Sequence, residues 1–443
     1  MVRHGADRSD PAHRAFAEAD EKIQLIAMIQ SGRVLRLFPE QGENGTQWYA
    51  PTDPVRALPK GDSVFIKGIF PLMYEAVRNG DSDGLRGLID KTAAFQRERG
   101  AAVSPMNKAP VSQRGRGAAG FLPEGRLKAE LLYNRLDAVP WLYRIDLCCG
   151  LLAFAYFVWS LASGRRNRRI ERLSLVPLAG TAVLLTVSMA LRGYAAGHLP
   201  LSNGYETMIF VSWCLSLLAL GIGRRFPIAA ASGLLMSGFA LLVASLGMAN
   251  PQITPLVPVL RSPWLSLHVS LIMVSYALLG LLMLNGTAAL ALAAAARAGT
   301  AERTSRTLAR LRLFGRLLLY PAVFLLTAGI FTGAVWANAS WGRYWGWDPK
   351  EVWALITLIV YALPLHEQSL ARFRRPLFFH AYSLWAFAAV LMTYFGVNYF
   401  LGGMHSYGGG FRPGYAAATV FAAVTAFALL TVAALIRQRR TDT

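Results

Sequence analysis

Long apolar runs separated by short polar loops dominate the chain from residue 145 to its C-terminus. A helix that spans a bilayer needs about 20 consecutive apolar residues, so each run predicts a transmembrane helix. The pattern predicts about nine such helices, near residues 145–162, 173–192, 207–223, 227–248, 265–296, 316–338, 351–366, 378–399 and 414–436. We therefore expect residues 145–443 to form an all-α polytopic membrane bundle.

Residues 1–144 have a different pattern, with charged residues throughout and no run long enough to span a membrane. The stretches EKIQLIAMIQSGRVLRLFP and QWYAPTD are typical of mixed α and β structure. Residues 101–123 are rich in Gly, Ala, Arg and Pro, which predicts a flexible linker. The sequence thus predicts a separate mixed α/β region before the membrane domain.

Arginine is distributed very unevenly among the loops of the membrane domain. Nineteen arginines fall in alternate loops and at the C-terminus, whereas the other side of the bundle carries only Arg192, Arg261, Arg343, Lys350 and Arg412. Basic loops stay in the cytoplasm, so this asymmetry predicts a multi-pass membrane protein with its C-terminus inside. The charge of +20 is therefore a topology signal, and no nucleic-acid partner is expected.

An odd number of helices places residues 1–144 outside, together with the loop at 341–348. The first residues, MVRHGADRSDPAHRAF, contain no apolar segment typical of a signal peptide. We therefore expect an upstream segment to precede this sequence. The alternative is that the first transmembrane helix alone exports the N-terminal region.

The cysteine and glycine patterns exclude a CxxC site for thiol exchange or zinc, and they exclude direct ATP hydrolysis. Cys148, Cys149 and Cys214 all lie within apolar runs, and no CxxC motif is present for thiol exchange or zinc. No Gly-Lys dipeptide occurs, which excludes a P-loop and direct ATP hydrolysis by this chain.

The stretch WGRYWGWDPKEVWALITLIVYALPLH, residues 341–366, places a cluster of aromatic residues before an apolar run. Asp348 as N-cap, a proline at the first helical position and Glu351 predict that a helix begins here with a capping box. Tryptophans at a membrane surface are often only an interfacial belt, which is the alternative to a binding role. The candidate binding residues of this loop are Trp341, Tyr344, Trp345, Trp347 and Asp348.

Three histidines lie close to this loop or to the helix that follows it. His268 comes four residues after Trp264, and His405 lies in GGMHSYGGG, both near the outer surface. His366 lies about 24 Å along the helix that starts at Glu351, so we expect it deep in the membrane. Because iron accepts neutral imidazole and the haem macrocycle needs apolar walls, we hypothesise that His268 and His405 are the axial ligands of one haem. The alternative for each is a hydrogen-bonded surface histidine.

Four basic residues of the same side are candidates to pair with the haem propionates, and the sequence does not rank them. They are Arg261, Arg343, Lys350 and Arg412.

These residues resemble the tryptophan-rich WWD motif of haem-handling proteins. WGRYWGWDP and its continuation to residue 366 resemble CcsA, the membrane half of the CcsBA (System II, ResC-like) cytochrome c synthases. Further similar stretches are GHLPLSNGYETMIFVSW at 197–213, SPWLSLHVS at 262–270 and GVNYFLGGMHSYGGG at 396–410. Residues 22–142 resemble more loosely the end of the outside domain in fused CcsBA proteins.

The resemblance implies two haem sites. An outer site would use His268 and His405, and an inner entry site would use His366 together with a histidine of the CcsB half. This sequence lacks that half, so we expect a separate CcsB-like partner or additional upstream sequence. His380 is a further, weaker candidate for the second inner ligand, whereas His198 is expected only to make a loop hydrogen bond to the backbone.

The activity implied by the resemblance is cytochrome c biogenesis. Haem b would be cargo, carried across the membrane and presented for thioether attachment to the CxxCH motif of apocytochrome c. The chain would then be part of a holocytochrome c synthase, and its partners would include apocytochrome c and a separate thiol-reducing system. Two alternatives remain: an exporter of haem or another amphipathic solute, and a non-catalytic haem chaperone.

Overall fold

A computed structural model describes residues 11–30, 35–42, 45–53, 59–101, 124–246, 251–253, 262–296, 298–401 and 414–442. The chain divides into two compact units, Met1–Glu124 and Gly125–Thr443. The division falls at the end of the segment 101–123 that the sequence predicts to be a linker. Each unit is therefore described by itself.

The first unit combines helices with one small sheet, as the sequence predicts. Strands β1 (Phe38–Gly42) and β2 (Gly45–Tyr49) pair antiparallel, with Phe38 opposite Tyr49. Phe38 is fully buried and packs with Ile66 and Ile69, which lie three residues apart on one face of a helix. The helices are α1 (Pro11–Gln30), α2 (Lys60–Arg78) and α3 (Ser82–Ala101).

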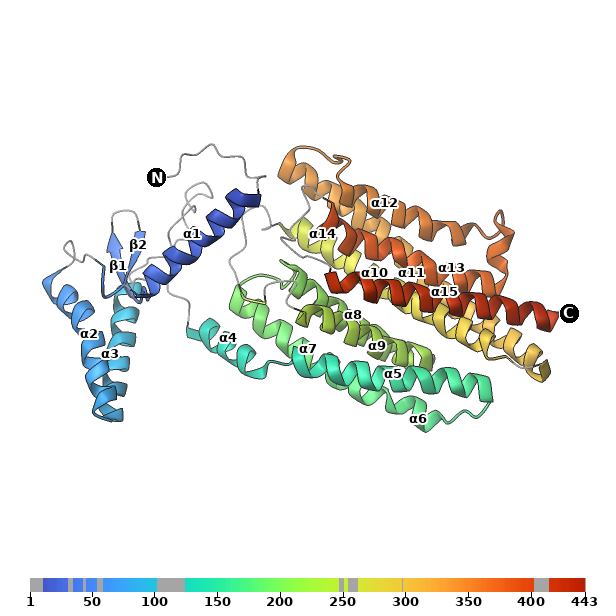
Figure 1. The fold of residues 1–443 in the computed structure, drawn as a ribbon, viewed down its shortest axis with the longest axis horizontal. Helices are drawn as coiled ribbons and strands as arrows, with labels where there is room; N and C mark the ends of the chain where they lie inside the picture. Colours follow the sequence, from blue (N-terminus) through green and yellow to red (C-terminus); the bar gives the residue numbers. More distant parts are fainter. Residues whose placement is uncertain are drawn as a thin grey trace. The chain divides into compact units, whose positions relative to one another are not determined.

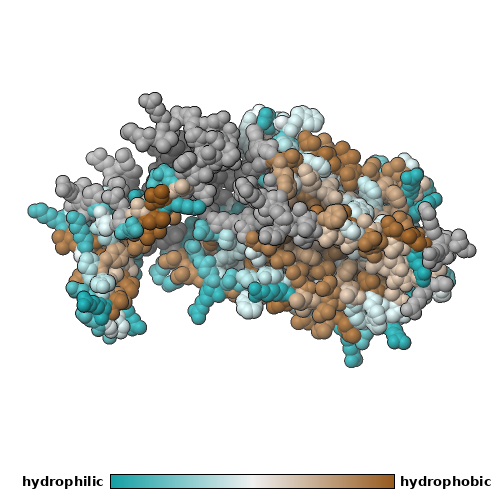
Figure 2. Space-filling model, in the orientation of Figure 1, coloured by the Kyte–Doolittle hydropathy of each residue, from teal (hydrophilic) through white to brown (hydrophobic). Residues whose placement is uncertain are grey.

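The second unit is a helical bundle (Figure 1). Its flank seen in Figure 2 is largely hydrophobic along the middle and hydrophilic at the ends, as expected for a surface that lipid covers. Its elements are α4 (Glu124–Leu136), α5 (Val139–Ser163), α6 (Arg168–Leu173), α7 (Leu175–Ala196), α8 (Gly204–Gly223), α9 (Pro227–Ser245), α10 (Pro263–Ala294), α11 (Ala301–Trp341), α12 (Pro349–Ala362), α13 (Pro376–Leu391), α14 (Val397–Phe400) and α15 (Gly414–Asp442).

Eight helical stretches in the described residues are long and apolar enough to cross a membrane. They correspond to eight of the nine expected runs, which confirms the all-α polytopic membrane bundle. Helix α10 lies at its centre and packs against α8, α9, α11, α13 and α15. Apolar residues on all sides of α10 make this central position favourable.

The remaining run, 351–366, is not one continuous α-helix. Helix α12 ends at Ala362, and Leu363–His366 forms a 3₁₀ turn. Pro364 has no backbone N–H, so the carbonyl of Val360 loses its usual helical donor. The Tyr382 hydroxyl of α13 donates to that carbonyl at 2.8 Å instead. Together the helix and the turn still extend about 29 Å, close to the thickness of the hydrocarbon core.

A buried ion pair connects α7 and α8. Arg192 Nε donates to Glu206 Oε1 at 2.8 Å, and both side chains are 2% exposed. The guanidinium also donates to the carbonyls of Pro251 (2.7 Å) and Gln252 (3.1 Å). The second carboxylate oxygen accepts hydrogen bonds from the backbone N–H and the hydroxyl of Ser202. The pair is thus satisfied on both sides, which a buried pair requires.

We predict that Glu206→Gln destabilises the protein by about 3–5 kcal/mol, because it leaves a buried guanidinium without its counter-charge. Thermal unfolding in detergent measures this effect. Glu302→Gln is the control, because the Glu302–Arg306 pair is exposed and contributes little. An equal shift of the unfolding temperature in both variants would contradict the prediction.

Candidate functional site

The loop at 341–348 begins where α11 ends. Gly342 adopts φ of 72° as the C-cap, and its N–H donates to the carbonyl of Asn338 at 2.9 Å. This left-handed conformation is favourable for glycine and disfavoured for other residues. Just before it, the ring of Trp341 packs edge-on against Trp336, which is 2% exposed, with 4.7 Å between the centroids. The start of the loop is therefore anchored on a buried indole.

The end of the loop is held by the expected capping box, which the structure confirms. Asp348 Oδ1 accepts from the N–H of Lys350 at 2.9 Å, and Glu351 Oε2 accepts from the N–H of Asp348 at 3.2 Å. Glu351 Oε2 also accepts from the N–H of Gly346 at 2.8 Å. One carboxylate thus fixes both the helix start and the loop backbone before it.

Between these anchors the loop exposes large aromatic side chains. Trp347 is 72% exposed and Tyr344 is 61% exposed. Trp347 has φ of 56°, a conformation that costs a residue other than glycine roughly 1–2 kcal/mol. Trp345 packs edge-on against Trp347 at 5.9 Å, and its buried Nε1 has no hydrogen-bond partner in the described part of the chain. A strained and exposed tryptophan is the kind of feature that marks a binding surface.

His268, in the second turn of α10, has a defined orientation. Its Nδ1 lies 2.6 Å from the carbonyl oxygen of Gly329 in α11. A carbonyl only accepts, so Nδ1 carries the proton and the ring's lone pair is on Nε2. Metal-bound histidines usually donate their second nitrogen in this way, which fixes the ring and makes it a better ligand.

Two glycines of α11, in the sequence GIFTG, allow α10 to approach this closely. A Cβ on Gly333 would lie 2.6 Å from the His268 ring, and one on Gly329 would lie 2.6 Å from Ile272 Cδ1. The spacing of four residues places both glycines on one face of α11. Small residues at this spacing are a known signal for close helix packing in membranes. This spacing is the feature of the sequence that could have revealed the contact between α10 and α11.

The other members of the proposed outer site divide into two groups. His405, Arg261 and Arg412 lie outside the described residues, so the pairing of His268 with His405 stays a prediction. Arg343 and Lys350 are described, and Lys350 Nζ donates to Asn398 Oδ1 at 2.8 Å. This hydrogen bond connects the first turn of α12 to α14, which precedes the segment that contains His405.

The side chain of His366 is exposed on the surface of this chain and is not enclosed among its helices, so its depth in the membrane stays a prediction. The exposure results from the position of α12, which packs mainly on α11 and α13 and has no helix on its other side in the described part of the chain. Nδ1 of His366 lies 3.0 Å from the carbonyl oxygen of Ala362 and therefore donates to it. The lone pair is again on Nε2. Nearby, Glu367 pairs with Arg312 and Arg316 of α11.

The two remaining histidines have different environments. His380 is fully buried, and its Nε2 lies 3.1 Å from the carbonyl of Leu308 in α11. It is therefore enclosed in the α11–α13 interface, whereas His366 is on the surface. His198 Nδ1 lies 2.9 Å from the carbonyl of Leu199, which confirms the expected backbone hydrogen bond.

Comparison with known proteins decides the family. Residues 201–405 match the cytochrome C assembly protein family. NrfI of Wolinella succinogenes is 34% identical over 398 residues, which are 89% of this chain and 42% of NrfI. CcsA of Synechococcus sp. (strain WH7803) is 35% identical over 308 residues, 59% of this chain and 94% of that protein. CcsA of Parasynechococcus marenigrum is 36% identical over 288 residues, 58% of this chain and 92% of that protein.

The chain belongs to the cytochrome c assembly family. The resemblance of its membrane domain to CcsA is therefore confirmed. The matched residues of this cytochrome c assembly protein include His268, the loop 341–348, His366 and His405. The chain spans less than half the length of NrfI, so what that longer protein does as a whole does not transfer directly.

We predict that Glu351→Ala loosens the loop at 341–348, because the N–H groups of Gly346 and Asp348 lose their acceptor. Loss of such a cap costs about 0.5–2 kcal/mol locally. Hydrogen exchange at these two amides is expected to accelerate. Tyr344→Phe is the control, because Tyr344 is 61% exposed and its hydroxyl group makes no hydrogen bond to the loop backbone among the described residues. Unchanged protection in Glu351→Ala would show that the capping box does not hold the loop.

Proposed function

We propose that this cytochrome c assembly protein binds haem outside the membrane, with His268 and His405 as axial ligands beneath the loop 341–348. The observation that carries the proposal is the hydrogen bond from His268 Nδ1 to the Gly329 carbonyl. It puts the ring's lone pair on Nε2, the nitrogen that we propose to coordinate iron, and it fixes the ring before iron arrives. A fixed ligand lowers the conformational entropy that is lost on binding.

The loop would supply the apolar cover for the macrocycle. The rings of Trp347 and Tyr344 are exposed and present flat apolar surface to water. Packing a flat apolar cargo against these rings would remove apolar surface of both from water, which is favourable. The capping box and Gly342 hold this surface at both ends. Arg343 and Lys350 are the described basic residues next to it, and either charge would pair with a propionate.

Haem would enter from the opposite side of the membrane at His366. This ring is exposed, and its lone pair is on Nε2, so it would provide one ligand and need a second from elsewhere. We propose that a CcsB-like membrane protein supplies the second ligand. The resemblance implies the bacterial inner membrane, and the arginine asymmetry supports an orientation with the C-terminus in the cytoplasm and residues 1–144 outside.

At the outer site, haem would be presented to the CxxCH motif of apocytochrome c. Each cysteine thiol adds across one vinyl group: a sulfur–carbon bond forms, the vinyl double bond is lost, and the thiol proton moves to the other vinyl carbon. The addition has no net redox change. The protein contributes position and axial ligation, as expected when the cargo carries the chemistry. Both thiols must be reduced first, and we assign this reduction to a separate thiol-reducing system.

The first test is the reduced absorption spectrum and haem content of the protein, purified with a CcsB-like partner. We expect bis-imidazole haem in the wild type and loss of the outer haem alone in His268→Ala, with recovery on adding imidazole. His198→Ala is the matched control, because in the described part of the chain that ring makes a hydrogen bond to its own loop alone. Co-expression with an apocytochrome c then tests thioether formation. Full haem retention in His268→Ala would contradict the outer site, and haem without covalent product would favour a chaperone.

We further predict that Gly333→Ala weakens haem binding by about 10–100-fold, the usual effect of disturbing a residue that orients a metal ligand. The added methyl group would meet the His268 ring and break its hydrogen bond to Gly329. Haem titration measures the change. Gly180→Ala is the control, because a Cβ at that position of α7 meets no atom within 4 Å. Equal affinity in both variants would show that the close approach does not matter for ligation.

A further inference from the structure

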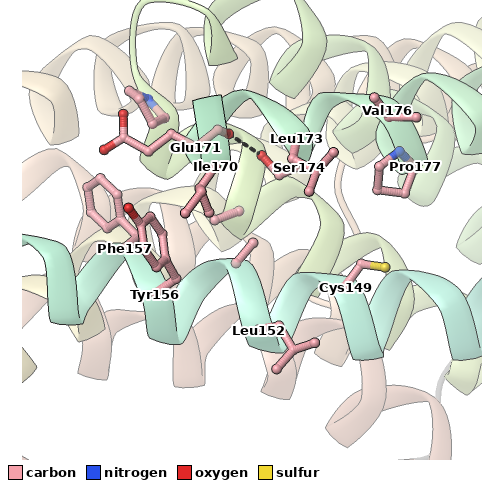
Figure 3. Close-up of a pocket in the computed structure, with 13 residues that line it drawn as sticks. Cys149, Leu152, Tyr156, Phe157, Ile170, Glu171, Leu173, Ser174, Val176 and Pro177 are labelled. Carbon is pink, nitrogen blue, oxygen red and sulfur yellow. Dashed lines mark hydrogen bonds between the residues drawn. The ribbon is translucent and has the colours of Figure 1, made fainter. Parts of the chain in front are cut away.

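A cavity of ≈ 380 Å³ lies between α5, α6, α7 and α9 (Figure 3). In the close-up, Ile170 and Leu173 lie above α5, with Cys149 at one end and Tyr156 and Phe157 at the other. Cys149 and Tyr156 are seven residues apart, so the cavity extends about 10 Å along α5. Its volume is in the range of small-molecule sites, which is about 300–1,000 Å³.

The few polar groups of the lining are already engaged. Arg166 Nε donates to both carboxylate oxygens of Glu171, at 2.6 and 2.9 Å. The Ser174 hydroxyl donates to the Glu171 carbonyl at 2.8 Å, and the Tyr156 hydroxyl accepts from the N–H of Asn167. An occupant would therefore meet mainly apolar side chains, among them Leu152, Phe157, Leu173, Pro177 and Ala231.

The cavity opens on the surface that lipid covers. Three of its lining residues are mostly exposed in the isolated chain: Leu152 (72%), Leu173 (65%) and Val176 (67%). These residues belong to helices of the candidate membrane spans, so their exposed faces meet acyl chains. The cavity is thus open to the bilayer, and its occupant can enter sideways from the lipid phase.

Positive charge surrounds the end of the cavity at α6. Arg165, Arg168, Arg169 and Arg172 are exposed, and in the described part of the chain none of their side chains makes an ion pair. The only acidic residue of the lining, Glu171, is neutralised by Arg166. Exposed arginines beside an apolar cavity favour a ligand with an acyl chain and an anionic head group.

We propose that this cavity binds one acyl chain of an anionic glycerophospholipid, whose phosphate lies against the arginines of α6. The exposed arginines beside the opening favour an anionic lipid over an uncharged transmembrane helix of a partner protein. The lining contains no histidine, the ligand type that we propose for haem at the other two sites. Helix α5 lies on the opposite flank of the bundle from α12 in Figure 1, so the lipid is distinct from cargo at His366.

The test uses Cys149 as a reporter in the full chain, with Cys148→Ser and Cys214→Ser removing the other thiols. Alkylation of Cys149 by a maleimide is followed by mass spectrometry after delipidation, with phosphatidylglycerol or phosphatidylcholine added back. We expect phosphatidylglycerol, and not phosphatidylcholine, to slow alkylation several-fold. We also expect native mass spectrometry to show a retained anionic lipid.

The charge requirement is tested with Arg168→Gln, Arg169→Gln and Arg172→Gln combined. Protection by phosphatidylglycerol is expected to disappear in this variant. The matched control replaces Arg372, Arg374 and Arg375, which lie in and directly after the short turn Ala371–Arg374, and is expected to keep this protection. Equal protection by both lipids, loss of protection in the control alone, or no protection by any lipid would overturn the proposal. Protection by added haem but not by phosphatidylglycerol would overturn it too and assign the cavity to cargo.

Discussion

In lipid, a backbone N–H or C=O without a partner costs several kcal/mol, and the arrangement of this protein depends on avoiding that cost. The long helices satisfy their own backbone groups, and each interruption near the candidate sites has a specific replacement. Tyr382 supplies the donor that Pro364 cannot give to Val360. The Glu351 carboxylate supplies the acceptor for two loop amides. Irregular backbone near these sites therefore occurs where a particular side chain supports it.

The same constraint connects packing with function at His268. Carbonyl oxygens inside a helix already accept one hydrogen bond, and the Gly329 carbonyl accepts another from the imidazole because no side chain at Gly333 blocks the ring. Close approach of α10 and α11 thus stabilises the bundle and selects the histidine tautomer in one arrangement. A larger residue at position 333 would change both properties together.

Much of this architecture could be predicted from the sequence, because long apolar runs and the capping box depend on local residue order. The runs indicated the membrane spans, and Asp348 with Glu351 indicated the start of α12. The surface position of His366 could not be predicted, because it depends on which helices cover α12. The partners of Arg192 could not be predicted either, since Pro251 and Gln252 meet it only after distant segments pack. The spacing of Gly329 and Gly333 predicts that another helix packs closely there. The sequence does not show that the residue packed against Gly333 is His268.

The loop between Gly342 and Asp348 has a consequence for how such a protein can vary. Its two ends are fixed by different elements, the C-cap of α11 and the capping box of α12, and Trp347 is already in a strained conformation between them. Because both ends are fixed, an inserted or deleted residue would displace one of them. The length of the loop is therefore constrained, and so are the residues that hold its two ends, Gly342 and Asp348.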